Sequence, residues 1–490
     1  MRMLPKNLRG PSRILLRLLG YGSLGALLAG IVALVIVLED AADLAVWHRA
    51  DLDEEFSMAS EVDSFEQYLD LEQRLFRQLD ELVYAEVPRG QRQIINRFSR
   101  GSLSDPERWP RNWNRSFILQ NDDPVAGVLL LHGLSDSPYS LRALGERIHA
   151  AGGWVLGLRI PGHGTAPAAL IETRWQDMAA AVRLAAREVE DSIGDRPFYI
   201  VGYSNGGALA VEYALAALDD SSLPRPDGLV LLSPAIGVSG VAALAVWQAR
   251  LGHLLGLEKL AWNTVLPEYD PYKYGSFPVN AGDLAYRITS HLRQRLVSMH
   301  GEAKLESMPP ILAFQSSADA TVTPQAVVEN LYSRLPSQDH ELVIFDINRN
   351  VDIEDMLQSD PIAVFKPLLY SENPGFDLTV VTNENDASAR VVALRNEDDR
   401  AGPPSSVVLG EWPEGIFSLS HVALPFPPTD PLYGGPEAGD SPGVQLGNLD
   451  LRGERGILRV SGADLLRLRW NPFYDYLESR TLQFMQLAER

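Results

Sequence analysis

The stretch Pro197-Phe198-Tyr199-Ile200-Val201-Gly202-Tyr203-Ser204-Asn205-Gly206-Gly207 places a serine between glycines, where a short apolar run passes into a helical pattern. The run before the serine is aromatic and β-branched, which favours a buried strand, and residues 208–215 have the apolar face of a helix. A serine at such a strand-to-helix turn forms a nucleophile elbow, which exposes its hydroxyl above the sheet and needs glycines for close packing. Ser204 is therefore the candidate nucleophile; the alternative is a glycine-rich turn whose serine only caps a helix.

Short apolar runs alternate with helical patterns on both sides of this elbow. The apolar runs cover residues 128–131, 154–158, 198–201, 229–232, 311–314 and 342–345, and the helical patterns cover 140–151, 174–192 and 205–218. Such alternation indicates βαβ units and a buried, mostly parallel sheet, with the doubly wound topology that right-handed connections produce. The sequence thus predicts an α/β fold whose functional site lies at the strand ends.

Composition excludes several classes of function. The 490 residues carry a formal net charge of -21, and no basic stripe is present, which argues against a nucleic-acid partner. The chain has no cysteine, so disulfides, thiolate metal sites, cysteine nucleophiles and a lipobox-type lipid anchor are excluded. No metal-ligating spacing and no phosphate-binding glycine-lysine loop is found, so the sequence predicts neither a metal nor a cofactor.

The amino-terminal residues have the pattern of a membrane anchor. Five basic residues precede an uncharged, mostly apolar run from Leu18 to Leu38, and Glu39 and Asp40 follow it at once. The run is long enough to span a bilayer, and positive charge before it places the N-terminus in the cytoplasm. We therefore expect residues 1–45 to be a tail and uncleaved anchor and the rest to be exported, into the periplasm in a bacterium; the alternative is a cleaved signal peptide.

Four further segments complete the predicted organisation. Residues 46–115 form a helical stalk, because apolar residues recur at helical spacing between Asp63 and Val83, with an acidic polar face that favours docking on the protein over the membrane. The catalytic domain spans residues 116–490. Within it, the leucine- and aromatic-rich segment 237–307 is interpreted as a helical cap over the site, with additional core as the alternative. Segment 348–413 has β-like runs and is interpreted as an extension of the sheet.

Three motifs resemble the α/β-hydrolase superfamily. They are Leu130-Leu131-His132-Gly133, Arg159-Ile160-Pro161-Gly162-His163-Gly164 and Gly202-Tyr203-Ser204-Asn205-Gly206. The closest group is the branch of monoglyceride lipases, carboxylesterases and serine aminopeptidases, and the similarity runs from about Ser116 to His421. The resemblance implies that the backbone amides of Leu134 and Asn205 form the oxyanion hole. It also implies that His132 and His163 belong to structural loops.

The resemblance also implies an acid and a base. An aspartate after a late strand matches Asp319, with Asp346 in reserve and a surface turn residue as the alternative reading. The superfamily normally has its histidine shortly after the next strand, where this chain has Asn348-Arg349-Asn350. The next histidine is His421, 102 residues after Asp319, and an inserted sheet extension accounts for that separation.

His421 preserves the order serine, acid, histidine. The competing histidines have less suitable positions: His340 precedes its strand, at the end opposite the elbow, and the others lie in the cap, on a crossover helix or beside the membrane. They are His48, His149, His253, His291 and His300.

These predictions add up to a membrane-anchored serine hydrolase of carboxylic esters, with Ser204, His421 and Asp319 acting as a triad through an acyl-enzyme. The apolar cap and the bilayer favour acyl esters of lipid type as substrates. Two alternatives stay open: a serine exopeptidase or amidase of the same branch, and a hydrolase-fold binding protein without activity whose anchor and insertion serve a partner. The sequence names no protein partner.

Overall fold

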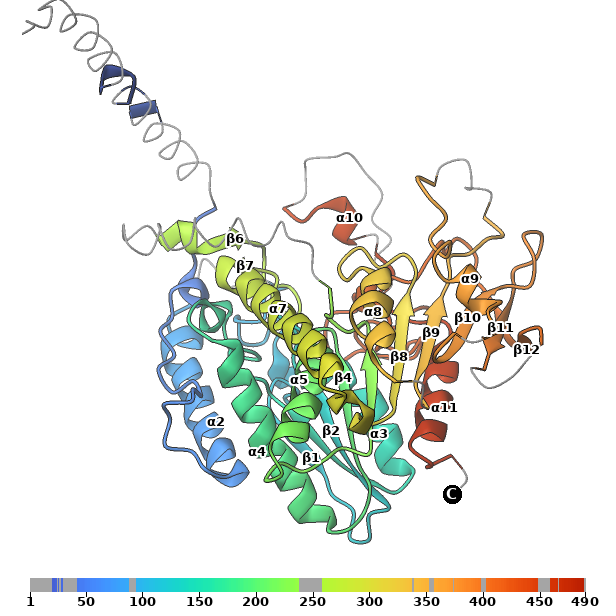
Figure 1. Ribbon diagram of the computed structural model, residues 1–490. Helices are drawn as coiled ribbons and strands as arrows, with labels where there is room; N and C mark the ends of the chain where they lie inside the picture. Colours follow the sequence, from blue (N-terminus) through green and yellow to red (C-terminus); the bar gives the residue numbers. More distant parts are fainter. Residues whose placement is uncertain are drawn as a thin grey trace, which may run out of the picture.

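The structure is a computed structural model of the chain. It describes residues 20–23, 25, 28–29, 42–87, 94–237, 258–336, 339–351, 357–372, 374–397, 402–447, 459–465 and 467–488. Within these residues ten strands form one large sheet, with helices on both of its faces (Figure 1).

The centre of the sheet is parallel, as the sequence predicts. Its strands are β2 (Ala126–Leu131), β3 (Gly153–Leu158), β4 (Phe198–Tyr203), β5 (Gly228–Leu232), β8 (Ile311–Ser316) and β9 (Glu341–Phe345). They lie in the order β3-β2-β4-β5-β8-β9, and every neighbouring pair is parallel. Their carboxyl ends therefore meet at one edge of the sheet, which is where α/β proteins build their sites.

Both edges of the sheet carry added strands. On one side β1 (Phe117–Leu119) pairs antiparallel with β3. On the other, β10 (Asp377–Asn383) pairs parallel with β9, and β11 (Arg390–Asn396) and β12 (Ser405–Glu411) follow as antiparallel neighbours. These three strands belong to segment 348–413 and lie at one side of the molecule in Figure 1. The segment thus continues the sheet beyond β9.

Alternate residues of each central strand point into two separate cores. In β2, Leu129 and Leu131 pack into one core, while Val128 and Leu130 pack into the other. The first core is covered by α4 (Trp175–Ile193), α5 (Asn205–Asp219) and α7 (Val279–Gly301), and the second by α3 (Arg142–Ala150) and α11 (Tyr474–Phe484). Burial of both faces explains why the strands are almost entirely apolar.

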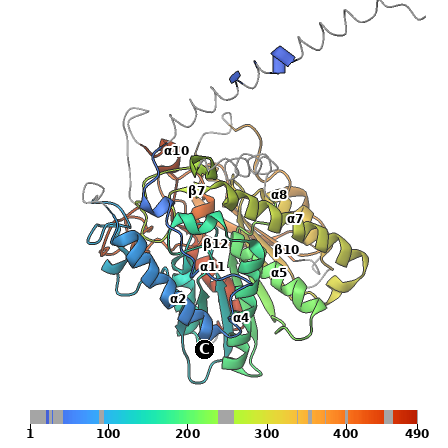
Figure 2. The same cartoon turned by 90° about the vertical axis from the view of Figure 1, so that its left-hand side faces the viewer.

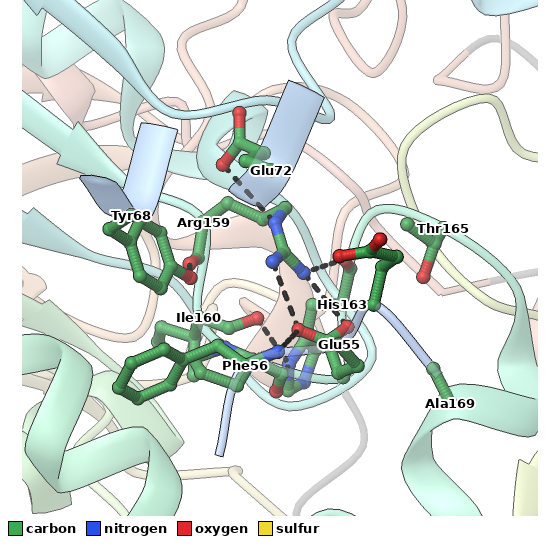
Figure 3. Close-up of polar contacts among 12 residues, drawn as sticks. Glu55, Phe56, Tyr68, Glu72, Arg159, Ile160, His163, Thr165 and Ala169 are labelled. Atoms are coloured by element: carbon green, nitrogen blue, oxygen red, sulfur yellow. Dashed lines mark hydrogen bonds and ion pairs between the residues drawn. The ribbon is translucent and has the colours of Figure 1, made fainter. Parts of the chain in front are cut away.

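Segment 46–115, predicted as a stalk, is docked on this sheet-and-helix body. Helix α2 (Phe65–Leu79) begins at Ser64, whose hydroxyl accepts from the Gln67 amide, and its residues Phe65, Tyr68 and Leu71 lie in the first core. Helix α2 lies beside α4 in both views (Figures 1 and 2). The polar contacts are equally extensive, because the buried Arg159 joins Glu55 and Glu72 from this segment to the loop after β3 (Figure 3).

Only part of the predicted cap 237–307 lies over the site. Helix α7 is a crossover between β5 and β8, and its residues Ile288, Leu292 and Leu296 are buried in the first core. This helix is therefore part of the core, which was the alternative to a cap. Residues 262–278, which contain the short pair β6 (Trp262–Thr264) and β7 (Phe277–Pro278), lie beside the candidate site. The leucine-rich residues 251–257 of the prediction lie outside the described residues.

Most of the membrane anchor predicted at residues 18–38 also lies outside the described residues, which in that range are 20–23, 25 and 28–29. A search of the described helices found none with the length and apolar character needed to cross a bilayer.

Buried His340 gives a testable pH dependence of stability. Its side chain is 1% exposed and accepts the Ile311 amide on Nδ1 at 3.1 Å. Burial lowers the pKa of His340 to about 4 from its ordinary 6.5, so the unfolded chain takes up this proton at higher pH than the folded one. The stability that neutral His340 contributes to the folded state is present above pH 6.5 and is lost as the pH falls toward 4. Asparagine can accept the same amide without titrating.

We therefore expect His340→Asn to flatten the dependence of the unfolding free energy on pH by up to about 1.4 kcal/mol per pH unit between pH 6.5 and 4. Urea unfolding of wild type and variant at pH 7, 6 and 5 measures this slope. The other titratable groups are common to both proteins and cancel in the comparison. Equal slopes would show that His340 does not enter the folded state as a neutral, low-pKa group.

Candidate active site

Ser204 occupies a strained turn between β4 and α5. Its backbone has φ 53° and ψ -115°, a conformation that non-glycine residues rarely adopt. The two flanking glycines are required by packing. A Cβ on Gly202 would lie 2.5 Å from the Gly206 carbonyl oxygen, and a Cβ on Gly206 would lie 2.0 Å from that of Leu131. Ser204 therefore has the backbone geometry of a nucleophile elbow.

Backbone hydrogen bonds fix this turn against the next strand. The Ser204 amide donates to the Leu232 carbonyl at 2.9 Å, and the Ala235 amide donates to the Ser204 carbonyl at 2.9 Å. The elbow is thus tied to the residues at and beyond the carboxyl end of β5. This anchoring can sustain a backbone conformation that an isolated turn would relax.

Asp319 and His421 meet at the same edge of the sheet. Asp319 lies in the turn after β8, and His421 begins a short 3-10 helix at His421–Ala423. The Nδ1 atom of His421 lies 2.7 Å from Oδ2 of Asp319, although the two residues are 102 positions apart in the chain. Both side chains are buried.

The surroundings of Asp319 keep it ionised. Burial by itself raises the pKa of this carboxyl, but the hydrogen bond and charge of His421, with the amides of Val322 and Thr321, outweigh burial and hold the pKa below its ordinary value. An ionised Asp319 accepts the proton on Nδ1 of His421. In the neutral ring with its proton on Nδ1, the Nε2 atom carries the lone pair that a general base requires.

The inserted strands explain how a histidine so late in the chain reaches this place. After β9, the amide and side chain of Asn348 donate to the carbonyls of Phe417 and Ile416. The chain thus leaves the sheet at residue 348, builds β10–β12, and returns to the same point before His421. The Ser316 hydroxyl then fixes the returning chain by donating to the Leu419 carbonyl at 2.8 Å.

The contacts between the elbow and His421 run through Tyr203. The ring of Tyr203 lies 5.4 Å from the imidazole ring, and its hydroxyl donates to the His421 carbonyl at 3.4 Å. A hydrogen bond from the Ser204 hydroxyl to the His421 ring is not among those that the described residues form. Catalytic hydrogen bonds are often long in the absence of substrate.

The two amides predicted for an oxyanion hole both lie at turns beside the elbow. Asn205 is the first residue of α5, whose N-terminal amides have no partner within the helix. Leu134 lies in the turn after β2, closed by the Asp136 amide donating to Gly133. Neither the Leu134 amide nor the Asn205 amide donates to a backbone carbonyl in the described part of the chain.

The competing residues are engaged elsewhere. The reserve acid Asp346 pairs with Arg349 at 2.8 Å and accepts from the Thr382 hydroxyl at the end of β9. His132 and His163 are buried in loops: Nε2 of His132 accepts the Ile160 amide at 3.0 Å, and Nδ1 of His163 lies 3.0 Å from the Pro161 carbonyl. Among the described residues, no cluster of acids and histidines that could hold a metal ion is found.

The sequence reasoning missed Gln315. Its side-chain amide donates to Oδ2 of Asp319 at 2.8 Å, the same oxygen that contacts His421. The available signal was a polar residue inside an otherwise apolar buried strand, which is an expensive arrangement unless the side chain has a partner. Gln315 thus helps to fix the orientation of the Asp319 carboxylate.

A cavity of about 290 Å³ is lined by Val422, the residue that directly follows His421. Its walls come from three segments distant in the sequence, namely residues 264–277, 422–433 and 460–469, together with Asp136. Lys273 pairs with Asp136 at 2.9 Å in this wall, and the Tyr433 hydroxyl donates to Asp270 at 2.6 Å. The sequence analysis named none of these groups as part of a site.

Comparisons with known proteins found matches to parts of this chain. Residues 122–348 match the family described as serine aminopeptidase, S33. A thermostable monoacylglycerol lipase of Bacillus sp. (strain H-257) is 26% identical over 46% of this chain and 82% of its own length. Phospholipase YtpA of Bacillus subtilis (strain 168) is 26% identical over 30% of this chain and 51% of its own length. A solved structure from work on the metagenome-derived lipolytic enzymes LipS and LipT is 25% identical, with a TM-score of 0.36, over 47% of this chain and 87% of its own.

The parallel sheet, the strained serine turn and these sequence matches define the class of protein as an α/β-hydrolase. Within that superfamily the matched relatives are lipase-like, and this similarity supports a carboxylic ester hydrolase of the lipase- and esterase-like branch.

Proposed function

We propose that this chain hydrolyses carboxylic esters with Ser204 as nucleophile, His421 as general base and Asp319 as the residue that orients it. The observation that carries the proposal is the 2.7 Å hydrogen bond between Asp319 and His421, two residues 102 positions apart. They converge on the sheet edge that also carries the strained Ser204.

The proposed reaction follows from these roles. The Ser204 hydroxyl oxygen attacks the ester carbonyl while its proton passes to Nε2 of His421, and the amides of Leu134 and Asn205 stabilise the oxyanion. The tetrahedral intermediate collapses, the bond to the alcohol oxygen breaks, and His421 returns the proton to the leaving alcohol. A water molecule, deprotonated by His421, then attacks the acyl-enzyme. The bond from the acyl carbon to the Ser204 oxygen breaks, His421 returns the proton to that oxygen, and the carboxylic acid leaves.

The proposed substrates are acyl esters of lipid type. Two relatives, a monoacylglycerol lipase and a phospholipase, support this class. The alternative of an exopeptidase or amidase needs an acidic group that can bind a free α-amino group. The two buried acids of the cavity wall, Asp136 and Asp270, already accept from Lys273 and Tyr433, which favours the ester.

We further propose that residues 18–38 anchor the protein in a membrane, with the N-terminus in the cytoplasm and the catalytic domain exported. The support is the charge pattern of the sequence, with basic residues before the apolar run and acidic residues after it. Anchorage would place the site close to lipid esters. Protease protection of the full chain in sealed membrane vesicles tests this orientation.

The proposed nucleophile can be tested with a fluorophosphonate probe on the full-length chain, since such a probe reacts with activated serines. We expect one labelled peptide, containing Ser204, with labelling lost in Ser204→Ala and strongly slowed in His421→Ala. The matched control is His149→Ala, which removes a histidine from α3 and should label like wild type. Absence of label on folded wild type would favour the binding-protein alternative, and normal labelling of His421→Ala would mean that another group is the base.

A further inference from the structure

Two arginines face the cavity beside His421. Arg467 and Arg469 lie in a stretch without helix, two positions apart, and both line the cavity. The intervening Leu468 packs instead against the second core. In extended backbone, residues two positions apart point to the same side, which explains this division.

Arg469 is buried, and only part of its hydrogen-bonding capacity is used within the described residues. The residue is only 9% exposed, its guanidinium donates to the Tyr269 hydroxyl at 3.4 Å, and its Nε atom is buried with no partner among the described residues. An unpaired donor in a charged group is costly to bury. A ligand oxygen in the cavity would supply the acceptor that the Nε donor of Arg469 lacks.

The acids of the cavity do not neutralise this pair by direct contact. Three acids line the cavity: Asp136 pairs with Lys273, Asp270 accepts the Tyr433 hydroxyl, and Asp464 accepts the Ser461 hydroxyl. The amides of Tyr272 and Lys273 also donate to Asp270. Within the described part of the chain, no carboxylate lies within 4.0 Å of a nitrogen of Arg467 or Arg469.

The position of the cavity next to the candidate base places it on the side of the alcohol part of the ester. Val422, which lines the cavity, directly follows His421. In acyl transfer the histidine protonates the leaving alcohol, so the alcohol part of the ester lies on the histidine side. A volume of about 290 Å³ is at the small end of ligand cavities, which span about 300–1,000 Å³, and suits a head group more than a long acyl chain.

We propose that this cavity binds an anionic group, a phosphate or a carboxylate, on the alcohol part of the ester, and that Arg467 and Arg469 are the residues that select it. This inference rests on the proposed function, since it names the substrate class of the same site. Guanidinium groups suit both anions, because their planar donors match pairs of carboxylate or phosphate oxygens.

The test compares three esters of one acyl chain on the full-length enzyme: 1-octanoylglycerol 3-phosphate, octanoyl glyceric acid and neutral 1-octanoylglycerol. We expect a higher kcat/KM for at least one anionic ester than for the neutral one, and the better of the two identifies phosphate or carboxylate. In Arg467→Gln the ratio of anionic to neutral kcat/KM should fall about tenfold or more, the scale of one charge-assisted hydrogen bond. Arg467 is half-buried, so its replacement is compatible with folding. The matched control is Arg225→Gln, which removes an exposed arginine before β5, at the opposite end of the sheet.

The outcomes separate this inference from the proposed function. Turnover of the neutral ester that Ser204→Ala abolishes, with no anionic preference in wild type, would overturn the inference and leave the proposed function standing. If wild type prefers the anionic esters and Arg467→Gln keeps that preference, the assignment of this cavity as the anion site would be overturned. A folded wild type that hydrolyses none of the three esters, and is not labelled at Ser204, would overturn both.

Discussion

Replacing either Ser204 or His421 by alanine is expected to lower kcat for a carboxylic ester by roughly 10⁶-fold, and the double variant should be no slower than either single one. The reason is that the serine is a weak nucleophile until the histidine removes its proton, so each residue is useless without the other. Asp319→Asn should cost about 10⁴-fold, because an amide cannot hold His421 in the tautomer that accepts the serine proton. Steady-state hydrolysis of a chromogenic acyl ester at pH 7 measures all four variants.

The control for the acid is Asp346→Asn, which changes the other aspartate at a strand end. Asp346 contacts Arg349 and Thr382 and makes no hydrogen bond to a histidine among the described residues, so kcat should fall less than about tenfold. Additive losses in the Ser204 and His421 double variant would argue that the two residues do not act as one unit. A larger loss in Asp346→Asn than in Asp319→Asn would reassign the acid.

The sheet was predictable because its signal is local. Each buried parallel strand is a short apolar run, and each of the predicted runs from residue 128 to 345 is a strand in the structure. The elbow is also recognisable locally, since Gly202, Ser204 and Gly206 lie within five residues of each other and a Cβ on Gly202 would meet the backbone of Gly206. Local sequence therefore carried the fold and the position of the candidate nucleophile.

The pairing of Asp319 with His421 is a different case, because nothing local joins residues that are 102 positions apart. Its prediction came from the order of residues in a resembling superfamily. What the sequence could not show is the physical link, in which Asn348 binds the returning chain at Ile416 and Phe417. Hydrogen bonds to backbone carbonyls are independent of the partner's side chain, and leave no pattern to detect.

Docking of the N-terminal segment on the protein was predicted, but its contact with α4 and the cavity were not, for a related reason. The amphipathic pattern of α2 shows that one face is buried, but not what covers it. Arg467 and Arg469 look like ordinary surface cations, because charged residues are mostly exposed. Only the tertiary structure shows that Arg469 is 9% exposed and that both arginines line a cavity.

Arg159→Met is expected to destabilise the protein by about 3–5 kcal/mol, the typical cost of removing one partner from a buried ion pair. Arg159 is fully buried and contacts Glu55 at 2.9 Å and Glu72 at 3.2 Å (Figure 3). Without the guanidinium, the buried carboxylate of Glu72 would keep its hydrogen bonds to Ser116 but lose its ion pair with Arg159. Adding Glu55→Gln and Glu72→Gln to the variant should recover part of the loss, because the uncompensated charges are then removed. Urea unfolding at pH 7 measures the differences.

The matched control is Arg74→Met, which lies in the docked N-terminal segment. Its ion pair with Glu54 is exposed and should contribute no more than about 1 kcal/mol. Equal effects of the two variants would show that the Arg159 cluster does not hold the segment to the domain.

The location of Arg159 also predicts that, in Arg159→Met, urea releases the N-terminal segment before it abolishes ester hydrolysis. Its Nη1 donates to the His163 carbonyl at 3.1 Å, and the Ile160 amide donates to His132, the second residue before Leu134. The loop 159–164 thus connects the docked segment to the proposed oxyanion turn. In Arg159→Met, limited proteolysis within residues 46–87 should therefore accelerate at urea concentrations below those that abolish ester hydrolysis. Loss of activity before any such cleavage would mean instead that the arginine acts mainly on the oxyanion turn.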